Sequence, residues 1–110
     1  MVYDADLAAR VRELLAARRD VEERKMFGGL AFMVGGNMSV AVSGNGGLMV
    51  RVPPAETEQL LTRKHVEAMV MANREIRGWV LVQPDGVKTS RQLSEWVNRG
   101  AEFAEGLPPK

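Results

Sequence analysis

The sequence contains no cysteine, and His65 is its only histidine. The absence of cysteine excludes disulfide bonds, thiolate nucleophiles and zinc sites built on sulfur, and a single histidine excludes a histidine-rich metal site. No apolar run approaches the roughly 18 residues that a membrane-spanning helix needs. The formal net charge of +1 is too small to indicate nucleic-acid binding by itself. We therefore expect a cytoplasmic protein that holds no metal or cofactor and does not enter the membrane.

A chain of 110 residues has the usual size of one domain with one hydrophobic core. The segment 4–20 begins with Asp4 as a helix cap and carries leucine and valine at helical spacing. A second strong helix is predicted from Thr89 or Ser90 until Gly106, where glycine followed by two prolines ends it. We expect a single domain over 1–106 and a tail over 107–110.

Strand patterns fill the middle of the chain. Apolar or alternating stretches cover 30–34, 37–43 and 48–52, with 24–27 leading into the first of them, and a second hairpin is predicted over 67–71 and 76–82. Pro53 and Pro54 introduce a short helix between the two groups of strands. The predicted order is α-β-β-β-α-β-β-α. This order indicates an α+β fold with a mostly antiparallel sheet and helices packed on one face.

The glycine clusters admit two interpretations. Glycine-rich sequence cradles phosphate where a strand runs into the start of a helix. In this sequence 28–29, 35–36 and 44–47 each run from one predicted strand to the next, and no GxxxxGK[ST] motif is present. The pattern favours turns over a phosphate site.

Candidate catalytic residues are few. His65 and Glu67 are two positions apart and lie on the same side if the segment is extended, so they form a possible base and orienting group. No nucleophile with a local signature accompanies them, and the paired acids Asp4 with Asp6 and Glu56 with Glu58 are already explained by helix starts. We therefore expect no enzyme activity. The alternative is an enzyme or small-ligand site near the second hairpin, with His65, Arg74 and Arg77 holding an anion.

Methionine is frequent on the predicted strands. Alternation places Leu48, Val50, Ile76 and Val80 toward the helices and groups Met38 with Val40 and Val42. The opposite face then carries the candidate partner surface: Met49, Arg51, Met69, Met71, Arg74, Arg77, Trp79 and Leu81. Methionine either fills gaps in a core or adapts a surface to its partners. An apolar patch with arginines suggests a protein interface, so we expect a protein partner and a homodimer. Scattered basic pairs leave direct DNA binding as a weaker alternative.

Four stretches carry a resemblance to a known family: "RKMFGGLAFMVGGNM", "LMVRV" followed by proline, "AMVMANREIRGWVLV" and "EWVNRGAEFAEGLPPK". Together they resemble the TfoX N-terminal domain family, whose most specific block here is Met26, Phe27, Gly28 and Gly29. The family takes its name from the TfoX, or Sxy, regulators of competence for DNA transformation, which carry a second, helical domain that these 110 residues do not include. The resemblance implies a secretion-chaperone-like α+β fold. It also implies a non-catalytic role in transcription regulation through an unknown regulator or the transcription machinery, and it transfers no catalytic residue.

Overall fold

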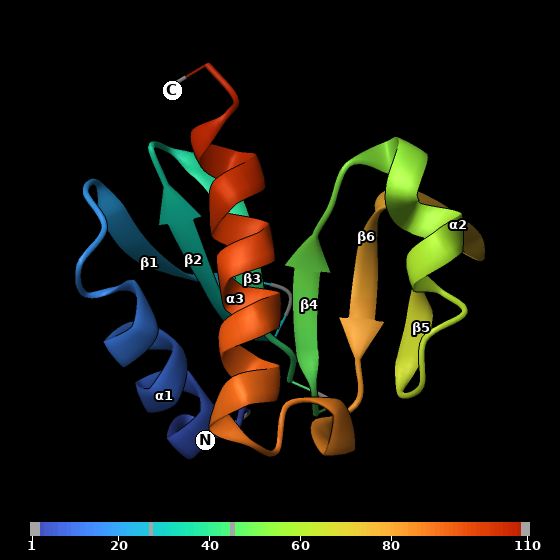
Figure 1. The fold of residues 1–110 in the computed structure, drawn as a ribbon, viewed down its shortest axis with the longest axis horizontal. Coiled ribbons are helices and arrows are strands. Elements are labelled where there is room, and N and C mark those ends of the chain that lie inside the picture. The colour runs from blue at the N-terminus through green and yellow to red at the C-terminus, as the bar shows by residue number, and fades with distance from the viewer. Residues whose placement is uncertain (1–2, 27, 45, 109–110) are drawn as a thin grey trace.

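The computed structural model describes residues 3–26, 28–44 and 46–108, and for Met71 it describes the backbone alone. Within these residues the chain forms one six-stranded antiparallel sheet with helices on one face (Figure 1). The strands are β1 Val21–Met26, β2 Gly29–Val34, β3 Asn37–Val42, β4 Leu48–Arg51, β5 Val66–Met71 and β6 Arg74–Val82. The helices are α1 Ala5–Leu15, α2 Thr57–Leu60 and α3 Ser90–Glu105. The predicted α+β class and antiparallel sheet are confirmed.

The strand order across the sheet is β1-β2-β3-β4-β6-β5. The sheet thus has one strand more than the predicted order, because Val21–Met26 is a full edge strand rather than a lead-in. Four charged residues follow one another in β1, from Glu22 to Lys25, so no apolar alternation marks it in the sequence. Its stability comes from pairing with β2 and from Arg12 of α1, whose guanidinium binds Glu23 at 2.5 and 2.7 Å.

The main core lies between the sheet and the helices. Helix α3 packs on β2, β3 and β4, α1 packs beside α3, and α2 packs on β6. Buried residues of all three helices join one cluster with the valines and leucines that point from the strands, such as Val40, Leu48 and Val80. Asp4 caps α1, and Thr89 forms a capping box with Gln92 at the start of α3, as the sequence predicts.

The glycine clusters are turns, which confirms the prediction for the described residues. Gly28 and Gly35 adopt positive φ between consecutive strands, and so does Gly46 between β3 and β4. Gly29 is required for a different reason, because a Cβ there would collide with the carbonyl oxygen of Val42 on β3. None of these three glycine turns leads into a helix start, so within the described residues they do not build the geometry of a phosphate loop.

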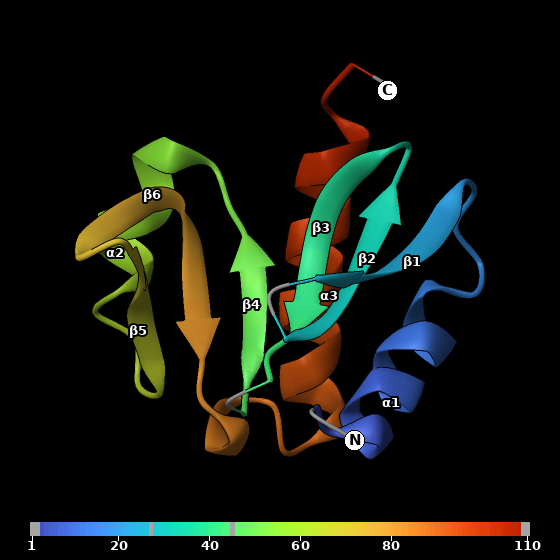
Figure 2. The same ribbon diagram turned by 180° about the vertical axis from the view of Figure 1, so that it is seen from behind.

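Two irregularities change which side chains share a face. At Ser39 the pairing of β2 with β3 shifts, since Phe32 pairs with Val40 but Met33 pairs with Met38. The second irregularity lies in β6, where Gly78 has a φ of 91° and the pairing with β5 is interrupted. Figure 2 shows the sharp bend of β6. Each irregularity reverses the alternation on one side of it.

These reversals correct three predictions. Met38 does not share the helix-covered face with Val40, because Ser39 is the extra residue between them. Ile76 does not face the helices but lies on the same side as Trp79. Arg77, expected beside Trp79, instead donates a hydrogen bond to the carbonyl oxygen of Pro54 at 3.3 Å.

Candidate ligand and partner surface

One face of the sheet carries no helix within the described part of the chain, and we call it the helix-free face; Figure 2 shows it with α3 behind the strands. Its centre is nevertheless buried. Ala31 and Ala41 are 0% and 1% exposed, and Met33 and Met49 are 8% and 7% exposed. Partly buried side chains pack around this centre, namely Met26, Met38, Met69, Trp79 and Leu81. The side chains of this face therefore cover its centre themselves, and a hollow remains beside them.

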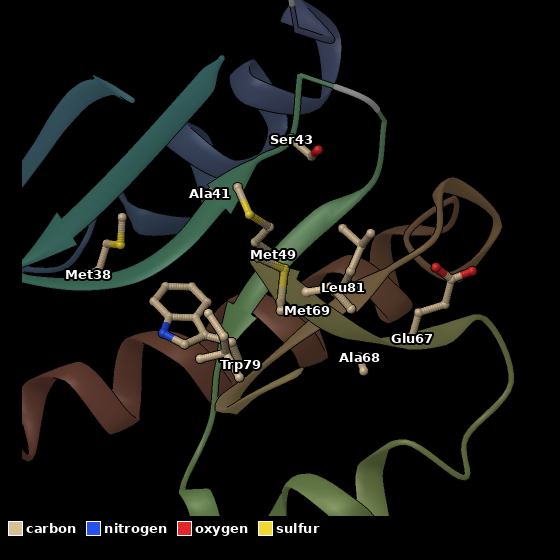
Figure 3. Close-up of a pocket in the computed structure, with 11 residues that line it drawn as sticks. Met38, Ala41, Ser43, Met49, Glu67, Ala68, Met69, Trp79 and Leu81 are labelled. Carbon is tan, nitrogen blue, oxygen red and sulfur yellow. The ribbon is translucent and has the colours of Figure 1, made fainter. Parts of the chain in front are cut away.

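The hollow contains a cavity of about 520 Å³, which we call the Trp79 pocket (Figure 3). Its main walls come from four strands and include Met38, Met49, Glu67, Met69, Trp79 and Leu81. In Figure 3, Met49 and Met69 lie between Trp79 on one side and Glu67 on the other. A volume between about 300 and 1,000 Å³ is typical of small-molecule sites.

Backbone pairing sets the positions of the pocket residues. Ala41 pairs with Met49, Met49 pairs with Leu81, and Leu81 pairs with Glu67, so one row of side chains crosses β3, β4, β6 and β5. Residues directly opposite in an antiparallel sheet point to the same face. The pocket therefore follows from the register of the sheet.

The lining is apolar apart from two groups. Glu67 is the only ionisable side chain among the described lining residues, and Ser43 contributes a hydroxyl. Glu67 is exposed, whereas Ser43 is buried. No lysine, arginine or histidine is found among the described residues of the lining. The chemistry of the pocket is therefore apolar with one negative charge at its rim.

Four residues of the predicted partner surface meet in this pocket: Met49, Met69, Trp79 and Leu81. The side chain of Met71 lies outside the described residues. Sequence reasoning missed Met38 and Ile76 as lining residues, because the shifts at Ser39 and Gly78 are invisible to simple alternation. Gly78 inside an otherwise alternating strand is compatible with such an irregularity but does not show which residues change face.

The predicted arginines do not line the pocket. The guanidinium of Arg51 lies 5.6 Å from the ring centroid of Phe103 on α3 and donates to the carbonyl oxygen of Met38 at 3.5 Å. Arg74 is exposed at the hairpin between β5 and β6, and Arg77 turns toward Pro54. An anion site built by His65, Arg74 and Arg77 is therefore not present at this cavity, and no arginine is found among its described lining residues.

The possible catalytic pair is not arranged as expected either. His65 has a φ of 67°, so the segment leading to Glu67 is not uniformly extended. Glu67 reaches the rim of the pocket, whereas His65 is outside its lining. Among the described residues no cluster of three or more histidines and carboxylates is suited to hold a metal ion.

Many of the basic side chains are paired with carboxylates. Arg18 binds Glu105 at 2.6 Å, and Arg63 binds Glu95 at 2.7 and 3.1 Å. Arg63 also stacks 4.6 Å from the ring centroid of Trp96, which is buried in the core. The hydrogen bond from Arg63 is the main cause that holds the pKa of Glu95 below its usual 4.5. These pairs reduce the free positive charge that a DNA surface needs.

The most specific sequence block has a structural role in the described residues. Met26 ends β1 and packs against the helix-free cluster, Gly28 makes the turn, and Gly29 passes close to Val42. Phe27 lies outside the described residues. The block therefore joins β1 to β2 and supplies one side chain to the border of the helix-free cluster.

Within the described residues, no helix combines the length and apolar character needed to cross a bilayer. Comparison with curated proteins and with solved structures gave no match. The model of the TfoX N-terminal domain matches residues 13–104, from within α1 to the last turn of α3. That match includes all six strands and the whole Trp79 pocket. The chain therefore belongs to the TfoX N-terminal domain family.

Proposed function

We propose that this chain is a non-catalytic regulatory module that acts on transcription through a protein partner, in the manner implied by its family. The observation that carries the proposal is the apolar helix-free face, which continues to the edge strand β5. Membership of the family supports a regulatory role but does not identify the partner.

The two edges of the sheet differ in how they are protected. Edge strand β1 carries four consecutive charged residues, from Glu22 to Lys25, whereas β5 carries only Glu67. Val70 on β5 is 59% exposed. Charged residues protect a sheet edge from pairing with other chains, so β5 is the edge that remains available.

The partner that fits this edge is an extended protein segment with apolar side chains. Such a segment adds a strand by main-chain hydrogen bonds and directs alternate side chains over the sheet face. Its apolar residues would lie over the helix-free face beside Met69. A second copy of the chain is the competing occupant, because antiparallel pairing of two β5 strands is self-complementary.

Site-specific photo-crosslinking in the source cell tests this role. Val70 is replaced by p-benzoylphenylalanine, and the exposed Glu13 on α1 receives the same residue as the matched control. We expect an adduct at position 70 that is absent at position 13 and that contains a transcription regulator or a polymerase subunit. An adduct of two copies of the chain would replace the proposed partner by a homodimer. Equal labelling at both positions would contradict a docking surface at β5.

A further inference from the structure

The floor of the Trp79 pocket belongs to the sheet itself. It consists of buried Ala41 and Met49 on neighbouring strands, and their positions are held by the register of the sheet. A floor held by strand pairing loses little conformational freedom when a molecule binds to it. The pocket is therefore suited to a small molecule as well as to a protein segment.

The lining residues indicate which apolar group such a molecule would carry. Met38, Met49 and Met69 are flexible and polarisable, and the indole of Trp79 offers an aromatic face beside them. Methionine sulfur makes favourable contacts with aromatic rings. An aromatic or alkyl body therefore gains most by lying among these side chains.

The charge at the rim of the pocket indicates which polar group the bound molecule would carry. Glu67 is the one ionisable lining residue in the described chain, and none of the ion pairs found among the described residues involves it. A carboxylate attracts a cation and repels an anion. The rim therefore favours a positively charged group over a negative one.

We propose that the Trp79 pocket binds a small organic cation, with an aromatic or alkyl body among the methionines and an amine directed toward Glu67. The proposed site reverses the charge of the anion site expected from the sequence. It goes beyond the partner role and does not depend on it, because binding is measured on the isolated chain.

Three probes with the same body separate the effect of charge from that of burial: phenylbutylamine, phenylbutanol and phenylbutyrate. Isothermal titration calorimetry on the full chain is expected to show saturable binding at one site per chain. The amine should bind about two- to fivefold more tightly than the alcohol, from the attraction of the exposed Glu67 carboxylate. The carboxylate should bind most weakly.

Two variants locate the site. Glu67→Gln should remove most of the preference for the amine and leave the affinity for phenylbutanol unchanged. Trp79→Leu should weaken binding of both the amine and the alcohol. Glu58→Gln, an exposed glutamate on α2 outside the pocket lining, is the matched control and should bind all three probes like the original chain.

Circular dichroism verifies that each variant is folded before titration. Equal affinity of the original chain for the three probes would contradict the role of charge. A loss of the amine preference in Glu58→Gln as large as that in Glu67→Gln would contradict it as well. Failure of all three probes to bind at millimolar concentration would overturn the site. None of these outcomes would affect the crosslinking test at Val70, so failure of this proposal is distinguishable from failure of the partner role.

Discussion

Both faces of the sheet are apolar, but they carry different types of side chain. On the helix-covered face, valine and leucine such as Val40, Val42 and Leu48 are fully buried beneath the helices. On the helix-free face, alanine and methionine form a smaller cluster, with half-buried Trp79 and Leu81 at its border. The two clusters share the same backbone, so the difference comes from the side chains and from what covers them.

This contrast separates a face that holds the fold together from one that is open to a ligand or partner. β-Branched valine has a restricted χ1 and packs tightly, so it suits a core with a single fixed arrangement of side chains. Methionine has three rotatable side-chain bonds and adapts to irregular shapes. A cluster of methionines around a cavity can therefore change its contacts without changing the sheet.

The largest expected effect compares one substitution on the two faces. Leu48→Ala removes a fully buried side chain under the helices and should reduce the free energy of unfolding by about 2–5 kcal/mol. Leu81→Ala removes a half-buried side chain from the Trp79 pocket and should cost about 1 kcal/mol. Urea denaturation measures both values. Equal costs would show that the helix-free face contributes to stability as much as the core does.

A smaller effect is expected at the irregularity that divides the faces. Ser39 is fully buried, and its hydroxyl donates a 2.7 Å hydrogen bond to the carbonyl oxygen of Phe32. Ser39→Ala should cost about 1 kcal/mol and shift the methyl resonances of Met33 and Met38. Exposed Ser90→Ala is the control for both measurements. Unchanged methionine resonances in Ser39→Ala would indicate that the shifted register does not depend on this hydrogen bond.

The smallest effect concerns pH and the ion pair on the helix-covered side. The pKa of Glu95 is lowered in the folded state, mainly by the hydrogen bond from Arg63. The stabilisation is therefore complete above the usual pKa of 4.5 and is lost as the pH falls through the lowered value. Because Glu95 is 43% exposed, Glu95→Gln should cost no more than about 1 kcal/mol at neutral pH.

Urea denaturation between neutral pH and pH 3 measures this pH dependence. Glu95→Gln should weaken the decrease in stability on the acid side, and Arg63→Gln should weaken it less, because Arg99 also binds Glu95 at 3.3 Å. The double variant should add little to Glu95→Gln, because the Arg63–Glu95 pair is already broken in that variant. An unchanged acid profile in both single variants would contradict the assignment.

The sequence predicted more of the fold than of the site. Local signals were sufficient for α1, for α3 with its Thr89 cap, and for the glycine turns. The grouping of Met49, Trp79 and Leu81 was also correct, because β4 and the part of β6 from Trp79 onward pair in regular register. Strand β1 was missed as a full strand, since its charged residues give no apolar period and its pairing involves β2.

The errors at the site have one physical cause. Met38, Ile76 and Arg77 were assigned to the wrong faces because alternation was continued across Ser39 and Gly78. An irregular pairing depends on two strands at once, so neither strand alone indicates where it occurs. The same limitation explains why the apolar patch was predicted without the cavity, whose lining includes Met38, Ile76 and the carboxylate of Glu67.

The sequence alone determined the helices, the turns and the apolar strands, because capping, glycine conformation and hydrophobic period act over a few neighbouring residues. The tertiary structure decided the six-stranded order, the shifts at Ser39 and Gly78, and the hollow that brings Trp79 and Glu67 to one cavity. These features depend on the register between strands that are far apart in the chain. Register is set by burying one face of the sheet, which happens only when these strands meet in the folded chain.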